Sequence, residues 1–196
     1  MELRVVPAAE AGWTAVDAVM QAEATSRDCQ CQFHLLDNAG YRATTRESRR
    51  GTLQEQIETW EPPRGLVALL DGEPAGWCGV EPRTRMAHLL ASRLVAKNSP
   101  YPAGDPGVWA IYCLLVPPRH RRQGLAAAML TAAVAYARAA GATALEGYPM
   151  DLGQRGGKLP SGFSTGTTAM FAREGFAPVA ALPSGRTLMH RPAALP

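Results

Sequence analysis

The sequence predicts one α/β (α+β) domain built around a mixed sheet, and three observations support this prediction. Residues 108–148 read as strand, basic turn, helix and strand, a βαβ unit whose two strands should be parallel. Asp71 and Gly72 separate two apolar segments, which is a strong signal for an antiparallel hairpin. Of the 196 residues, 46% are hydrophobic and 19% are charged, so the chain can bury a core. We therefore expect a single domain over residues 1–196.

The first third of the chain is expected to contain one strand and two helices. A short strand covers residues 2–6, and apolar residues at helical spacing predict a helix over residues 9–24. Residues 26–44 follow neither period and are expected to be irregular. Thr45 can cap a second helix, which Pro62 stops, and its buried face is expected to consist of Leu53, Ile57 and Trp60.

The predicted hairpin and its continuation occupy the middle of the chain. Its strands are expected at residues 65–70 and 75–80. Residues 84–96 have a weak helical pattern. Residues 98–107 contain three Pro and two Gly, so they are expected to form a loop.

The most informative segment begins with a strand over residues 108–116, which is apolar throughout, as in a strand covered on both faces. A helix over residues 124–140 follows, and Gly141 separates it from a strand over residues 142–148. Residues 149–166 hold five Gly and are expected to form a loop. A short helix, two strands and a frayed tail complete the prediction, at residues 167–174, 176–181, 186–190 and 192–196.

The turn before the helix at residues 124–140 has the features of an anion site. Arg121, Arg122 and Gln123 stand where Ser, Thr, Asp or Asn would cap the helix, and Gly124 lets a ligand approach the backbone. The N-terminus of a helix offers unpaired N–H groups and the positive end of the helix dipole. Neither GxxxxGK followed by Ser or Thr nor GxGxxG occurs in the chain. The sequence therefore predicts a phosphate-bearing ligand, bound otherwise than in a P-loop or Rossmann protein.

Two short sequences resemble motifs of the GNAT superfamily of N-acetyltransferases. RRQGLA at residues 121–126 resembles the signature Q/R-x-x-G-x-G/A, and it lies between an apolar strand and a long helix, as in that family. MFAREGF at residues 170–176 resembles the late helix of the family, followed by Gly-Phe. The resemblance covers about residues 65–180. It implies the GNAT fold, a central mixed, mostly antiparallel sheet with a splayed parallel strand pair and flanking helices.

The resemblance also implies acetyl-CoA (CoA) as the donor cofactor. The pyrophosphate would bind the backbone N–H groups of residues 122–127, and the pantetheine arm would pair with the strand at residues 114–116. The implied cofactor-binding residues are Leu114, Val116, Arg121, Arg122, Gln123, Gly124, Leu125, Ala126, Ala127 and Phe171.

The implied reaction is acetyl transfer to an amine by direct attack in a ternary complex, with a small-molecule amine as the expected acceptor. An alkylamine with a pKa near ~10.4 is mostly protonated at pH 7, so a base would assist the attack. Residues 26–64 and 82–107 are expected to shape the acceptor pocket. Dimers are common in the superfamily, so a homodimer is possible. The alternative function is a catalytically silent acyl-CoA-binding module that senses CoA or regulates a partner.

The candidate catalytic residues depart from the family pattern. Many members have a carboxylate on the central strand, but residues 108–116 contain none, so Glu81 and Glu146 on the flanking strands are the nearest candidates for the base. Each has a structural alternative, Glu81 as a turn cap and Glu146 as the ion-pair partner of an arginine. Phe171 replaces the tyrosine that usually protonates the thiolate. The candidate substitutes are Tyr148, Ser164 and Thr165.

The four cysteines suggest neither a disulfide framework nor a metal site. Cys29 and Cys31 are too close for an easy disulfide, which favours reduced thiols and a cytoplasmic location. With His34 they supply three ligands, whereas a closed zinc site needs about four, so no metal is predicted. Cys113 could form an acetyl-cysteine intermediate, but a lone buried thiol is usually inert.

Other classes of protein fit the sequence poorly. The net charge is +3 and the arginines are dispersed along the chain, so nucleic acid is not an expected partner. No apolar run approaches the ~20 residues of a membrane helix, and the N-terminus does not resemble a secretion signal.

Overall fold

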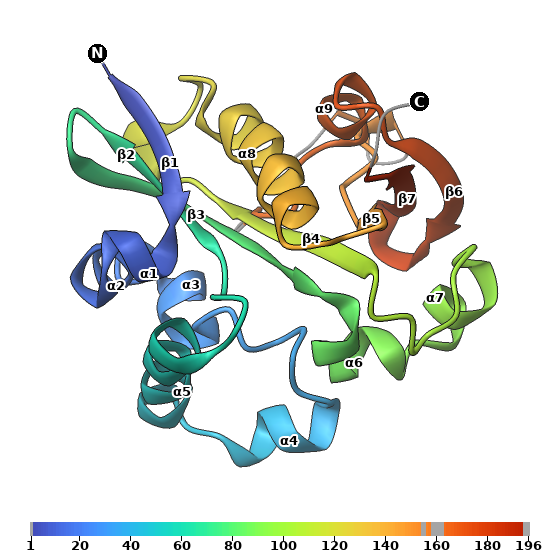
Figure 1. Cartoon of the computed structure of the whole chain (residues 1–196), viewed down its shortest axis with the longest axis horizontal. Coiled ribbons are helices and arrows are strands. Elements are labelled where there is room, and N and C mark those ends of the chain that lie inside the picture. Colours follow the sequence, from blue (N-terminus) through green and yellow to red (C-terminus); the bar gives the residue numbers. More distant parts are fainter. Residues whose placement is uncertain (1, 154–155, 158–162, 194–196) are drawn as a thin grey trace.

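The fold is a mixed sheet with helices on both faces (Figure 1). The computed structural model describes residues 2–153, 156–157 and 163–193. Within these residues the strand order is β1-β2-β3-β4-β5-β7-β6, and only β4 and β5 are parallel. The strands are β1 (Leu3–Pro7), β2 (Leu66–Leu70), β3 (Glu73–Pro82), β4 (Val108–Leu115), β5 (Ala144–Gly147), β6 (Ala177–Leu182) and β7 (Arg186–Pro192). The predicted fold class, mostly antiparallel with one parallel pair, is confirmed.

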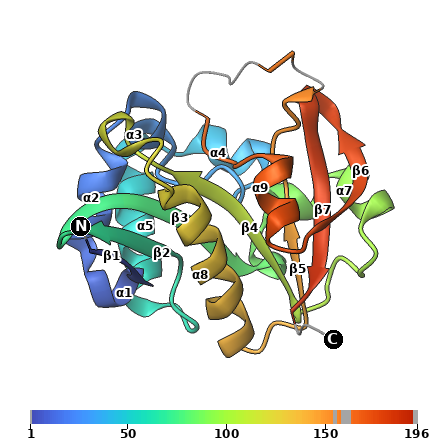
Figure 2. The same ribbon diagram turned by 90° about the horizontal axis from the view of Figure 1, so that it is seen from above.

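The helices cover both faces of the sheet (Figures 1 and 2). One face carries α1 (Ala8–Ala11), α2 (Trp13–Met20), α3 (Ala24–Cys29), α4 (Asn38–Ala43), α5 (Arg46–Thr59), α6 (Ala87–Leu90) and α7 (Arg93–Asn98). The other face carries α8 (Leu125–Ala139) and α9 (Thr168–Arg173). Short 3₁₀ turns lie at Arg83–Arg85, Pro118–His120 and Pro183–Gly185. None of the helices in the described part of the chain has both the length and the apolar character to cross a membrane.

Two buried apolar clusters form the core, one on each face of the sheet, where the helices pack against the strands. Met129 and Ala133 of α8 pack against one face, together with Ile111 of β4. Val16 of α2 and Leu53 of α5 pack against the other face. Successive side chains of a strand point to opposite faces, so the apolar run of β4 supplies both clusters, as predicted for a strand covered on both sides.

Local capping signals account for the elements that were predicted well. The Thr45 side chain accepts a hydrogen bond from the backbone of Ser48, and the Ser48 side chain accepts one from Thr45, which is a capping box at the start of α5. Asp71 and Gly72 both have positive φ, +50° and +85°, as the hairpin between β2 and β3 requires.

Two predicted helices and one segment predicted to be irregular differ in the structure. The helix expected over residues 9–24 is divided at Gly12, which has φ +81°, and its second part ends at Met20. Residues 26–44 contain α4 and most of α3, and Asp37 caps α4 by accepting a hydrogen bond from the Gly40 backbone at 2.7 Å. The helix expected over residues 84–96 is a 3₁₀ turn followed by α6 and α7. In the first and third cases tertiary contacts outweigh the helical spacing of the apolar residues, whereas in the second a local cap supports a short helix where no apolar period is present.

Two loop predictions fall partly outside the described residues. The predicted loop at residues 149–166 includes residues 154–155 and 158–162, and the predicted tail includes residues 194–196, which the structure does not describe. Pro192 ends β7, and the Ala193 N–H donates a hydrogen bond to the Thr143 carbonyl at 2.9 Å.

Candidate active site

A β-bulge in β4 places two consecutive side chains on the same face of the sheet. Val80 of β3 pairs with Ile111 and Gly79 pairs with Cys113, so Tyr112 is an extra residue in β4. Tyr112 and Cys113 therefore both face the cluster formed by the N-terminal helices. No feature of the apolar run at residues 108–116 signals this bulge.

The parallel strands β4 and β5 separate directly beside the bulge. Their pairing ends at Ile111 and Gly147, whereas β4 continues to Leu115. Beyond the last pair, the Leu114 N–H donates a hydrogen bond to the Ser164 carbonyl at 2.5 Å. The segment after β5 thus lies against the part of β4 that β5 has left.

The N-terminus of α8 is open, as the sequence predicts. Gly124 is its N-cap residue with φ +81°, and no side chain caps the helix. The N–H groups of residues 124–127 have no hydrogen-bond acceptor among the described residues. A Cβ added at Gly124 would meet no atom within 4 Å, so the space in front of these groups is open. This arrangement can bind an anion.

The three polar side chains before α8, at residues 121–123, differ in their hydrogen-bond and ion-pair partners. The Arg121 Nε donates to the Val116 carbonyl at 3.0 Å, and its guanidinium pairs with Glu23. Gln123 donates to the Arg119 carbonyl at 3.3 Å. Arg122 is exposed, has φ +61°, and has no ion-pair or hydrogen-bond partner among the described residues. The Arg122 guanidinium is thus the one in this turn that is available to an anion.

The remaining cofactor candidates lie on both sides of this helix end. Leu125, Ala126 and Ala127 form the first turn of α8, and of the three only Leu125 is buried. Phe171 is fully buried, and a Cβ at Gly147 would overlap its ring. Its ring also packs edge-on against Phe176, with ring centroids 5.0 Å apart. Phe171 therefore packs in the core where β5 ends.

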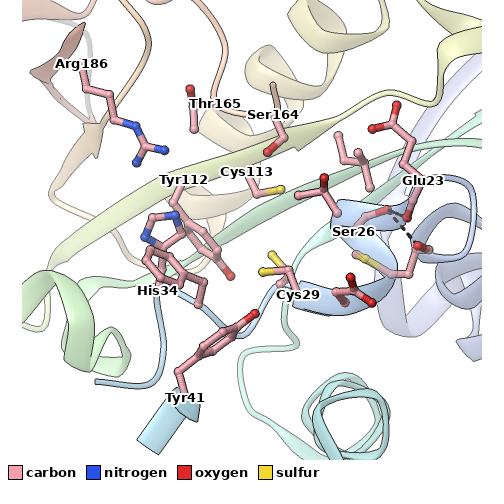
Figure 3. A pocket seen from close by; sticks show the side chains of 16 residues that line it. Glu23, Ser26, Cys29, His34, Tyr41, Tyr112, Cys113, Ser164, Thr165 and Arg186 are labelled. Atoms are coloured by element: carbon pink, nitrogen blue, oxygen red, sulfur yellow. Dashed lines mark hydrogen bonds between the residues drawn. The ribbon is translucent and has the colours of Figure 1, made fainter. Parts of the chain in front are cut away.

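A cavity of about 450 Å³ lies beside β4, on the face that carries Tyr112 and Cys113 (Figure 3). We call it the β4 cavity. Its wall comes from the ends of α2 and α3, the turn after α3, α4, β4, the segment after β5 and the start of β7. The lining residues are Met20, Glu23, Thr25, Ser26, Asp28, Cys29, Cys31, Phe33, His34, Tyr41, Tyr112, Cys113, Leu115, Ser164, Thr165 and Arg186. Its size suits a small molecule.

Three cysteines line the β4 cavity, and all are free thiols. The Cys31 sulfur accepts a hydrogen bond from the Trp77 indole N–H at 3.2 Å. Burial alone would raise the pKa of Cys31, but Cys113, Arg64, Trp77 and Tyr112 together lower it to about 7. The described residues contain no group of three or more His, Cys, Asp or Glu that could hold a metal ion.

Glu81 does not line the cavity, but it contacts Tyr112, which does. The Arg64 Nε donates to Oε1 of Glu81 at 3.2 Å, and both side chains are fully buried. The Tyr112 hydroxyl donates to the same oxygen and itself accepts a hydrogen bond from Arg64 at 3.0 Å. Oε2 of Glu81 has no partner among the described residues. Sequence reasoning selected Glu81 but missed Tyr112, whose only signal was a polar group in an apolar strand.

Glu146 and Tyr148 lie away from the β4 cavity and contact each other. The Arg83 guanidinium donates to Oε2 of Glu146 at 2.8 Å, and the Tyr148 hydroxyl donates to the same oxygen at 2.9 Å. Ser99 donates to Oε1 at 2.5 Å. Burial raises the pKa of Tyr148, and the Glu146 carboxylate raises it further. This arrangement corresponds to the structural alternative for Glu146, an ion pair with an arginine.

Comparisons with known proteins agree with this architecture. Residues 28–148 match the family described as Acetyltransferase (GNAT) family. The sequence matches none of the curated proteins.

Three similar solved structures illustrate the likeness of the fold. An N-acetyltransferase from Staphylococcus aureus Mu50 is 12% identical with a TM-score of 0.61, and the alignment covers 99% of this chain and 100% of that one. The PaiA N-acetyltransferase from Thermoplasma acidophilum, in complex with coenzyme A, is 10% identical with a TM-score of 0.56 and coverage of 98% and 99%. The putative acetyltransferase YncA from Salmonella typhimurium, with its cofactor acetyl-CoA, is 13% identical with a TM-score of 0.59 and coverage of 98% and 94%.

Proposed function

Because the chain belongs to the GNAT acetyltransferase family, we propose that it transfers an acetyl group from acetyl-CoA to the amine of a small molecule. The observation that carries this proposal is the uncapped N-terminus of α8, which opens beside the point where β4 and β5 separate. An anion-binding helix end next to a gap in a sheet suits a long ligand with a diphosphate at one end. The acceptor would occupy the β4 cavity.

The donor would be held mainly by backbone groups. The N–H groups of residues 124–127 would bind the pyrophosphate, and the Arg122 guanidinium would pair with it. The pantetheine arm would pair with Leu114 of β4 and with Val116, which follows the end of that strand. The Leu114 N–H donates to the Ser164 carbonyl, and the Val116 carbonyl accepts from Arg121. Pairing with pantetheine would replace both of these hydrogen bonds with bonds to the cofactor.

The chemical step would be direct attack in a ternary complex. The amine nitrogen forms a bond to the thioester carbon, the carbon–sulfur bond breaks, CoA leaves as a thiolate, and the nitrogen loses a proton. The hydrogen bond from Tyr112 to Glu81 supports a route by which that proton passes from the cavity through the Tyr112 hydroxyl to the carboxylate. Ser164, which lines the cavity beside Leu114, would donate a hydrogen bond to the departing sulfur.

The experiment that tests this function is a thiol-release assay with acetyl-CoA and a broad panel of small amines. We expect CoA release above the background rate of hydrolysis with at least one amine, together with its acetylated product. Tight binding of CoA without release for any amine would contradict the proposal.

That contrary outcome would favour the silent acyl-CoA-binding module, which one observation supports. Glu81 and Glu146 are both buried and paired with arginines, so neither carboxylate lies in the cavity wall. The homodimer and the cytoplasmic location stay predictions, and light scattering of the purified protein tests the former.

A further inference from the structure

Arg186 places a guanidinium in the wall of the β4 cavity, and none of the described residues is its partner (Figure 3). It is the only Arg or Lys among the lining residues, and it forms no ion pair or hydrogen bond with a described residue. Burial lowers the pKa of Arg186, because the charged form loses contact with water. An unpaired charge in a cavity is unfavourable, so this position suits an anion from outside the chain.

Thr165 supplies a second polar group without a partner in the same wall. Its side chain is 8% exposed, and its buried hydroxyl has no hydrogen-bond partner among the described residues. One stretch of backbone holds the segments of Thr165 and Arg186 together. The Met150 N–H donates to the Gly166 carbonyl at 2.9 Å, and the Asp151 N–H donates to the Gly185 carbonyl at 2.8 Å. The two groups therefore belong to one part of the wall.

The charge of this part of the wall matches a monoanion. His34 also lines the cavity, and its buried Nδ1 has no partner among the described residues. Burial, and then the charges of Arg186, His88 and Arg64, lower the pKa of His34 to about 3, so it adds no charge at pH 7. One guanidinium fits the two oxygens and single charge of a carboxylate, whereas a phosphate group carries up to about two charges.

We propose that the acceptor is an amine that also carries a carboxylate, which pairs with the Arg186 guanidinium and accepts a hydrogen bond from the Thr165 hydroxyl. This inference rests on the proposed function, because it defines the substrate class of the acceptor cavity. The acidic residues of the wall, Glu23 and Asp28, come from the segment around α3. Figure 3 shows Glu23 at the opposite end of the cavity from Arg186. The cavity thus presents positive charge at one end only.

Calorimetric titration of the CoA-saturated protein tests the inference without turnover. The probes are matched pairs that differ only in the carboxylate: glycine and glycinamide, β-alanine and β-alaninamide, and 4-aminobutyrate and 4-aminobutanamide. For at least one pair, we expect the carboxylate to bind at least about tenfold more tightly than its amide. A second arm repeats the pairs with acetyl-CoA and measures thiol release.

Three variants test whether residues of the cavity wall cause the tighter binding of the carboxylate. Arg186→Gln should abolish the difference within each pair, and Arg186→Lys should restore part of it. Thr165→Val removes a hydroxyl without a described partner, so it should fold normally and reduce the difference. Arg138→Gln, the same change as Arg186→Gln at an exposed position of α8, should leave the difference unchanged.

The two arms separate this inference from the proposed function. Equal binding within every pair, or a preference that survives both Arg186→Gln and Thr165→Val, would overturn the inference even if amines are acetylated. Preferential binding of carboxylates without any thiol release would support a carboxylate site at Arg186 and contradict the proposed acetyl transfer.

Discussion

The Tyr112 hydroxyl donates a hydrogen bond to Oε1 of Glu81, 2.5 Å away. The Tyr112 side chain lines the β4 cavity, whereas the Glu81 side chain does not. The bulge in β4 makes this contact possible, because it turns Tyr112 toward the same face as Cys113. Arg64 fixes both partners through hydrogen bonds to each of them. One hydroxyl therefore lies between Glu81 and the β4 cavity, as the proposed proton route requires.

Replacing Tyr112 with Phe should break this connection while retaining the ring. We expect kcat to fall by about 10²-fold or more, with little change in the KM for acetyl-CoA, because the donor site does not contact this hydroxyl. Steady-state thiol release measures both constants. Tyr101→Phe is the matched control, since its hydroxyl contacts His190 at 3.3 Å and lies outside the β4 cavity. An unchanged kcat in Tyr112→Phe would exclude the proton route.

Alanine at Gly124 should weaken CoA binding. The methyl group would stand in open space at the N-cap of α8, where the ligand is proposed to approach, and φ +81° strains any residue other than glycine by about 1–2 kcal/mol. Gly141→Ala is the control, because Gly141 has φ +91°, equally open space, and a position at the other end of α8. Both variants should lose similar stability in urea unfolding, but only Gly124→Ala should raise the Kd of CoA, by about tenfold or more. Equal Kd values in the two variants would refute the donor site.

Glutamine at Glu146 should destabilise the fold rather than slow the reaction. It leaves the buried Arg83 guanidinium without a carboxylate, which typically costs about 3–5 kcal/mol. Urea unfolding of Glu146→Gln, Arg83→Met and the double variant measures the coupling, and the double variant should lose less than the sum of the two. A large fall in kcat in a folded Glu146→Gln protein would instead restore Glu146 as the base.

The stability of the protein should fall in acid because of His34. Its pKa is about 3 in the folded chain and 6.5 in an unfolded one, so the unfolded state binds more protons between these values. The free energy of unfolding should therefore decrease as pH falls below about 6.5, by up to about 1.4 kcal/mol per pH unit. His34→Phe should remove this contribution, which urea unfolding at several pH values between 4 and 7 would show. A parallel decline in both proteins would mean that other groups cause it.

Much of the fold could be predicted because it depends on local signals. The Asp71-Gly72 turn, the Thr45 cap and the apolar run of β4 are legible in the sequence, and each produces the expected element. The open end of α8 was predicted for the same reason, since a missing cap is a local property.

The candidate active site could be predicted only in part, because it depends on contacts between distant residues. Glu81 pairs with Arg64, and Glu146 pairs with Arg83, 63 positions away in the chain. The residues next to either carboxylate in the sequence do not indicate that it forms a buried ion pair, or that one of the two lies close to a cavity. Arg186 had no signal at all, because only the packing of the segment after β5 against β7 brings it to the cavity wall.

The bulge leaves β4 one residue longer than its alignment with β3 needs. Ile111 and Leu114 already lie on the α8 side, with Tyr112 and Cys113 together on the other. A shortened chain lacking Tyr112 could keep every remaining side chain of the strand on its present face. It would lose the hydroxyl that contacts both Glu81 and Arg64, together with a ring that is buried in the core. The extra residue is therefore not needed for the alternation of the strand, and what it adds is a buried side chain between the β4 cavity and Glu81.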